Sequence, residues 1–244
     1  MTAALLTATM AGLIALASVV NSYVLAVAVL FLQVVCAYGW FRLAPVPAVR
    51  GSLTIAIGAG LAADVLLLLD RTHKVDSASV GPLAGVLGAA FVATFAYELF
   101  RPDRLEYLVA SVTSTVAGTT LTVLAAGLLA ERVAPGGRIV LVTSMAAVAA
   151  ATFLASMPGP TLVRVFFGTV AGGAAGYGVA KVVQDLGSFR SLLLGLSVGL
   201  LAAAATSVSA AARSSRRAVL SAAVMLPLAF AAPVTYVLGR MVVG

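Results

Sequence analysis

The chain has 244 residues, of which 62% are hydrophobic and 9% are charged, and its formal net charge is +7. Soluble domains average roughly 45–50% apolar and about 25% charged residues, so this composition excludes a soluble protein and predicts a polytopic membrane protein. No polar stretch is long enough to build a soluble domain. We therefore expect a single transmembrane domain over residues 1–244, an all-α bundle of about nine helices.

The basic residues fall between the apolar runs, where they anchor loops at anionic lipid headgroups. This distribution favours the lipid bilayer as a partner over nucleic acid. Thirteen of the fifteen basic residues are arginine, and together with abundant alanine, valine and glycine this is typical of GC-rich bacterial genomes. We expect a multi-pass protein of the bacterial cytoplasmic membrane.

Membrane-spanning helices need about 20 mostly apolar residues, and such runs, bounded by charge, proline or glycine, occur nine times. They cover residues 3–20, 23–41, 51–69, 79–98, 107–130, 139–157, 162–180, 190–212 and 218–239. Only Asn21 and Ser22 separate the first two runs, which predicts a tight helical hairpin. Eight helices is the alternative.

The first run ends in small residues, as a signal peptide does, but no lysine or arginine precedes it. We therefore expect the first helix to be retained. With nine helices, eight basic residues lie on the side of the N-terminus and seven on the other side, which does not decide the orientation. The densest basic cluster is RSSRR at residues 213–217, and we expect its Arg213, Arg216 and Arg217 in the cytoplasm.

Cys36 and His73 are the only cysteine and the only histidine. A lone cysteine within an apolar run provides neither a disulfide nor a thiolate cluster for a metal. His73 stands near Asp70 and Asp76 in a charged turn, where a solvated histidine is favoured over a catalytic triad. We expect no metal site and no cofactor.

Asp64 lies in the stretch GLAADVLLLL, only slightly beyond the midpoint of the third run. A carboxylate near the bilayer centre costs about 2.5–3.5 kcal/mol on insertion scales, so we expect Asp64 to face the bundle interior. Its expected partner is polar, with a hydroxyl of the fifth run as the candidate. An interhelical hydrogen bond and a proton or cation site are the two alternatives for its role.

Charged residues gather after the fourth run: Glu98, Arg101, Asp103, Arg104 and Glu106. Opposite charges within one short turn predict an interfacial ion-pair network that holds the loop. The alternative is a lipid-headgroup or metal site built from the three acidic residues. Lys181 and Asp185, four residues apart, are expected to pair in the same structural way.

The fifth run carries hydroxyl side chains along one helical face: Ser111, Thr115, Thr119 and Thr122. Hydroxyls in membrane helices usually bond back to the helix carbonyls or across to a neighbouring helix. A polar path along this hydroxyl stripe is the functional alternative.

Small residues predict where helices touch, because lipid tails give helices no hydrophobic reason to associate. Glycines four residues apart form three seams: Gly81 with Gly85; Gly168, Gly172 and Gly176; Gly195 with Gly199. The stretch GTVAGGAAGYG at residues 168–178 also has spacings of nucleotide-binding loops, but no strand precedes it, so packing is favoured. Pro227 and Pro233 should kink the last helix, which we expect inside the bundle, where neighbours can satisfy the freed carbonyls.

The C-terminal stretch contains spaced glycines, the turn Ser214, Ser215, Arg216, Arg217, and a final helix with FAAPVTY. These features, together with ELFRP at residues 98–102, resemble the phosphatidate cytidylyltransferases, membrane enzymes that make CDP-diacylglycerol. The number of helices and the chain length agree with the comparison. The resemblance implies a lipid-related membrane fold.

The resemblance stops where that family's chemistry begins. In the family, the matching Ser-Lys-Arg segment leads into a Lys-Asp pair, a Pro-Gly-His-Gly-Gly segment and further aspartates that bind metal and phosphates. Here Arg217 is followed by AVLSAAVMLPLAF, and no acidic residue follows Asp185. Because Mg²⁺ at phosphate sites is held through carboxylates, we expect no cytidylyltransferase activity.

Three functions are compatible with these features. The first is a non-catalytic membrane component that packs against another envelope protein or a second copy, favoured by the glycine seams and the scarcity of reactive side chains. The second is a degenerate relative of the lipid cytidylyltransferases. The third is an ion-coupled transporter that uses Asp64 and the hydroxyl stripe. We favour them in that order; whether the protein is an enzyme stays undecided, with a non-catalytic role favoured.

Overall fold

The protein is described by a computed structural model that covers residues 2–44, 49–73, 81–101, 104–183, 187–211 and 216–243. The side chains at 70–73, 104–107, 183, 211, 216–219, 242 and 243 lie outside that description. The helices are α1 (Thr2–Val20), α2 (Ser22–Leu43), α3 (Val49–His73), α4 (Gly81–Leu99), α5 (Arg104–Ala125), α6 (Gly127–Val133), α7 (Gly137–Ala155), α8 (Thr161–Val183), α9 (Ser188–Ala211) and α10 (Arg216–Val243). No strand occurs in these ranges.

The described residues form nine helical spans long and apolar enough to cross a membrane, which confirms the predicted multi-pass helical bundle. Eight spans are single helices. The remaining span, Leu108–Val133, combines most of α5 with α6. The two helices part at Ala126, whose amide bonds to the carbonyl of Val123, three residues back, so a tighter turn interrupts the α-helical ladder.

The predicted hairpin between the first two helices is present, with Asn21 as its only non-helical residue. Asn21 is extended and is the N-cap of α2, where its side-chain oxygen accepts a hydrogen bond from the amide of Tyr23. Asparagine is a favoured N-cap because its oxygen satisfies an amide that lacks a helical partner. The Asn21 amide still bonds to Ala17 of α1, so one residue ends one helix and begins the next.

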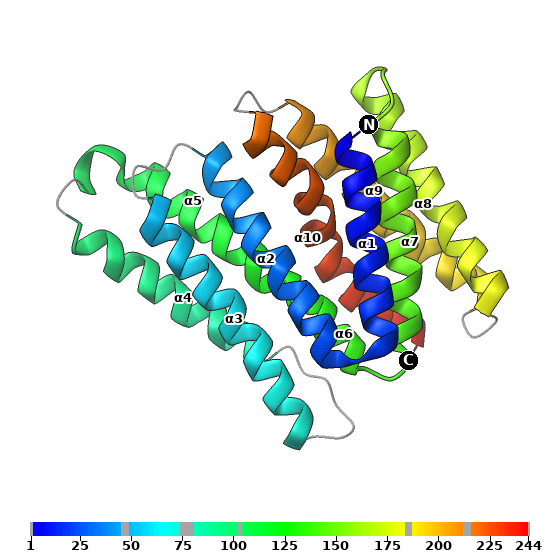
Figure 1. The fold of residues 1–244 in the computed structure, drawn as a ribbon, viewed down its shortest axis with the longest axis horizontal. Coiled ribbons are helices and arrows are strands. Elements are labelled where there is room, and N and C mark those ends of the chain that lie inside the picture. The colour runs from blue at the N-terminus through cyan, green and yellow to red at the C-terminus, as the bar shows by residue number, and fades with distance from the viewer. Residues whose placement is uncertain are drawn as a thin grey trace.

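The helices form two groups, and α1, α6 and α10 each contact both of them (Figure 1). One group contains α2, α3, α4 and α5, and the other contains α7, α8 and α9. α1 packs against α7 and α2, and α10 packs against helices of both groups, including α2, α5, α7 and α9. α10 therefore lies at the centre of the bundle, as predicted, and it stays helical through Pro227 and Pro233.

The glycine seams predicted on α8 and α9 face each other. A Cβ atom placed on Gly172 would lie 2.7 Å from both the Gly195 carbonyl oxygen and the Gly199 Cα atom. The two backbones can approach this closely only because the side chains are absent, which is the usual basis of helix contact in membranes.

The seam predicted at Gly81 and Gly85 is wrong. Gly85 is exposed, and a Cβ atom placed there would meet nothing within 4 Å. α4 instead packs through larger buried residues, Leu83, Val86 and Ala90. A spacing of four identifies residues on one helical face, but it does not say whether another helix covers that face.

Candidate functional site

Asp64 forms a buried polar pair with Gln33, deep within the bundle. Asp64 is 3% exposed and Gln33 is fully buried. The Gln33 Nε2 atom donates to Asp64 Oδ1 at 3.2 Å and lies 3.5 Å from the Gly60 carbonyl oxygen. Gln33 is near the middle of α2, and Asp64 lies three residues beyond the middle of α3. The pair therefore joins two helices at membrane depth.

The pair is incompletely satisfied. Asp64 Oδ2 and Gln33 Oε1 are both buried without a hydrogen-bond partner among the described residues. Each of these atoms is an acceptor when Asp64 is ionised. An unpaired buried polar atom lowers the stability of the fold by about 1–3 kcal/mol, and a charged one lowers it by more.

Asp64 faces the interior, as its position in an apolar run predicts, but its partner differs from the expected one. The hydroxyl stripe of α5 does not bond to Asp64; α2 supplies the partner through an amide. Gln33 is neither ionisable nor a hydroxyl, the two kinds of side chain that the sequence pattern singles out at membrane depth. Its signal was a lone amide in the middle of the apolar second run.

The hydroxyl stripe faces the neighbouring helices, and all four side chains are fully buried. Thr115 Oγ1 donates to Ser52 Oγ of α3 at 2.8 Å, and Thr122 Oγ1 donates to the Ala56 carbonyl of α3 at 2.9 Å. Thr119 Oγ1 has no partner among the described residues. Three of the four hydroxyls thus donate hydrogen bonds to neighbouring helices, and these bonds link α5 to α3 and α4.

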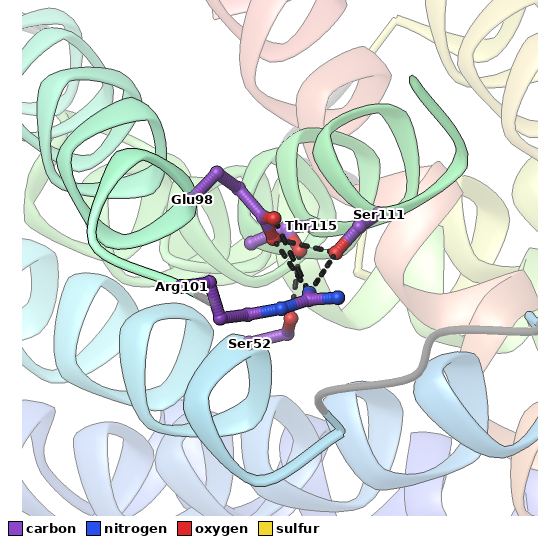
Figure 2. A network of polar contacts seen from close by, with 5 residues as sticks. All are labelled: Ser52, Glu98, Arg101, Ser111 and Thr115. Carbon is purple, nitrogen blue, oxygen red and sulfur yellow. Dashed lines mark hydrogen bonds and ion pairs between the residues drawn. The ribbon is translucent and has the colours of Figure 1, made fainter. Parts of the chain in front are cut away.

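Glu98, Arg101 and Ser111 form a compact network where α4 leads toward α5 (Figure 2). Arg101 Nη1 donates to both Glu98 oxygens, at 3.3 and 3.2 Å, and to Ser111 Oγ at 3.1 Å. Ser111 Oγ in turn donates to Glu98 Oε1 at 2.5 Å. Glu98 is 1% and Arg101 8% exposed, so the predicted ion pair exists but is buried rather than solvated.

The other members of the predicted charged groups cannot be placed in this network. Asp103, Arg213 and Asp185 lie outside the described residues, and so do the side chains of Arg104, Glu106, Arg216 and Arg217. Lys181 Nζ is 5.4 Å from the centre of the Tyr177 ring, a cation–π contact within its own helix.

Glu131 is a buried carboxylate that the sequence reasoning missed. It lies on α6, is 1% exposed, and neither of its oxygens has a hydrogen-bond partner among the described residues. Its carboxylate rests against Gly239 of α10, where a Cβ atom would collide with it. The predicted fifth run ends at residue 130, directly before Glu131, whereas the helical span continues to Val133.

The polar groups of the bundle are dispersed. No group of three or more His, Cys, Asp and Glu side chains within the described ranges is placed to hold a metal ion. The Gln33–Asp64 pair, the Glu98 network and Glu131 stand on different helix pairs. Of these, the Gln33–Asp64 pair is the candidate site, because an ionisable residue near the middle of a membrane span is a functional-site hypothesis.

Comparisons with protein-family models, with curated proteins and with solved structures gave no match to this chain.

Proposed function

We propose that this protein is a non-catalytic component of the bacterial cytoplasmic membrane that holds a transmembrane helix of another envelope protein. The observation that supports this function is an apolar trough along α1 and α2. Its larger part has a volume of about 580 Å³ and is lined by side chains that include Leu16, Val20, Val24 and Val27.

The trough continues toward the opposite end of the helices. A second hollow of about 240 Å³ adjoins the first through Met10 and Phe31 and extends to Leu6 of α1 and Leu220 of α10. Between Leu6 and Val20, α1 rises by about 21 Å at 1.5 Å per residue. One leaflet contributes only about half of the roughly 30 Å hydrocarbon thickness, so a single acyl chain is too short for the trough, whereas a membrane-spanning helix matches it.

The chemistry of the trough indicates the kind of helix that fits. The walls of its larger part are mostly large aliphatic and aromatic side chains, and Ala17 and Ala28 are the two small ones. Close helix contact in membranes requires small residues on at least one side, and the glycine seam of α8 is already covered by α9. The partner helix should therefore be apolar and present glycine or alanine to the trough.

A site-specific photo-crosslinker tests this proposal. Val27 lines the trough and is 70% exposed, while Val92 on α4 is 69% exposed and lies outside it. A crosslinker at position 27 in native membranes should give one discrete protein adduct, with the adduct peptide mapping to a membrane-spanning segment. The same probe at position 92 should not give that adduct.

A blocking substitution provides the second arm. Val27→Trp should fill the trough and reduce recovery of the crosslinked partner at least about tenfold, whereas Val92→Trp should leave recovery unchanged. Adducts with lipid alone, or equal adducts at both positions, would contradict the proposal. An adduct with a second copy of the chain would show that the trough binds the protein itself, and it would contradict a different protein as the partner.

An ion-coupled carrier is the second candidate, and the buried Asp64 favours it. Proton or solute flux in liposomes that contain the purified protein, lost in Asp64→Asn, is the result expected of such a carrier. Flux equal to that of empty liposomes would remove this candidate.

A further inference from the structure

Two acceptor oxygens remain unpaired in the Gln33–Asp64 pair, and they belong to the two groups that already touch. Gln33 Nε2 contacts Asp64 Oδ1, while Gln33 Oε1 and Asp64 Oδ2, the second oxygens of the same amide and carboxyl groups, lack donors. An ionised Asp64 cannot repair this, because two acceptors do not bond to each other. A single proton on Oδ2 turns Asp64 into a donor, and Gln33 Oε1 is an unpaired acceptor on the side chain that Asp64 already contacts.

We propose that Asp64 and Gln33 form a proton-binding site within the membrane. In this site, Asp64 Oδ2 carries a proton and donates a hydrogen bond to Gln33 Oε1. The amide and the carboxylic acid then exchange two hydrogen bonds, one in each direction. Binding takes one proton from water onto the carboxylate, and no other bond changes. Release of the proton leaves an unpaired charge between α2 and α3.

The backbone of α3 is shaped for this pair. A Cβ atom on Gly60 would lie 2.9 Å from Gln33 Oε1 and 3.0 Å from its Cδ atom. The amide therefore lies flat against α3, one turn before Asp64, in space that only glycine leaves open. The absence of a side chain at Gly60 leaves room for the Gln33 amide beside the Asp64 carboxyl group.

No described charged side chain compensates an ionised Asp64. α3 packs against α2, α4, α5 and α6, and the titratable side chains described on these five helices are Tyr23, Cys36, Tyr38, Arg42, Arg50, Tyr97, Glu98, Glu131 and Arg132. Gln33 is the side chain that hydrogen bonds to Asp64. Glu98 bonds to Arg101, Arg132 donates to the Ser18 carbonyl, and Arg42 lies over the Tyr38 ring.

A proton fits this site better than a metal ion does. Hard cations such as Ca²⁺ and Mg²⁺ gather about six or more oxygen ligands. The pair offers two unpartnered oxygens, which is the number that one hydrogen bond requires. Burial of a bare carboxylate in a low-dielectric interior is also costly, and uptake of a proton is the usual way to avoid that cost.

Infrared spectroscopy of the full chain in lipid nanodiscs at neutral pH tests the site. The difference spectrum between the native protein and Asp64→Asn should contain the carbonyl band of a protonated carboxylic acid, and the band should shift in deuterium oxide. Glu131→Gln is the matched control, because it removes another buried carboxylate, one whose two oxygens have no hydrogen-bond partner among the described residues. The Asp64 band should persist in that variant.

Gln33→Leu supplies an independent measurement. It removes the acceptor, so the acid band should remain and move to higher frequency as its hydrogen bond is lost. If Asp64→Asn fails to fold, native protein labelled with ¹³C-aspartate should show the isotopic shift of the same band. Absence of any acid carbonyl band that responds to Asp64→Asn or to labelled aspartate at neutral pH would overturn the proposal. An acid band whose frequency is the same in Gln33→Leu as in the native protein would also overturn it.

Discussion

The contact between α8 and α9 predicts a large effect from the smallest side chain. Gly172→Ala places a Cβ atom 2.7 Å from two backbone atoms of α9. Ordinary contact begins near 3.4 Å, so the helices must part by about 0.7 Å, a gap that forfeits a quarter to a half of the dispersion energy of each affected contact. Backbone atoms cannot rotate away as side-chain ends can, so we expect an overpacking cost of about 1–3 kcal/mol.

Gly178→Ala is the matched control on the same helix, because a Cβ atom there meets nothing within 4 Å. Both substitutions gain the same helix propensity, up to about 1 kcal/mol, so the difference between them isolates the collision. Unfolding by sodium dodecyl sulfate in mixed micelles, followed by circular dichroism and by fluorescence of the single tryptophan Trp40, measures it. Equal stability of the two variants would refute the close approach of α8 and α9.

Three further predictions concern the buried charges and the orientation. Arg101→Leu leaves the Glu98 carboxylate buried without its cationic partner, so the free energy of unfolding should fall by about 3–5 kcal/mol; adding Glu98→Gln should recover most of it, and no recovery would contradict the pairing. Gly239→Ala pushes a methyl group into the Glu131 carboxylate and should cost about 1–3 kcal/mol, part of which Glu131→Ala restores; an undiminished cost would place Glu131 elsewhere. A reporter fused after Arg217 should be active only in the cytoplasm, and activity only outside the cell would reverse the orientation.

Most of the fold was predictable from the sequence because membrane thickness sets helix length. Nine apolar runs gave nine spans, and Asn21 marked the hairpin because it is a good N-cap. The break at Ala126 was not predicted: Gly127 follows it, but glycine is frequent inside membrane helices, and neither proline nor charge marks the position. The exposed face at Gly85 was not predicted, because the spacing of small residues identifies one face of a helix but not whether a neighbouring helix covers that face.

The candidate site was predictable only in part. The energetic cost of a carboxylate in lipid placed Asp64 inside the bundle, but it could not name Gln33, which comes from a helix 31 residues earlier in the chain. Glu131 was not predicted, because a charged residue is taken to mark the end of a membrane span. A helix end held by neighbours can bury such a residue, and only the arrangement of α6 against α10 reveals it.

The central place of α10 has a consequence for biogenesis. α1 to α9 are synthesised before α10, yet α10 packs against helices of both groups. At Gly39 of α2, a Cβ atom would lie 2.8 Å from the Ala222 amide nitrogen of α10, so this contact cannot form until α10 has inserted. Until then, the faces that α10 later covers are open to lipid or to the insertion machinery. The contacts of α10 with both groups are thus completed late, and a defect in α10 leaves only α1 and α6 in contact with both groups.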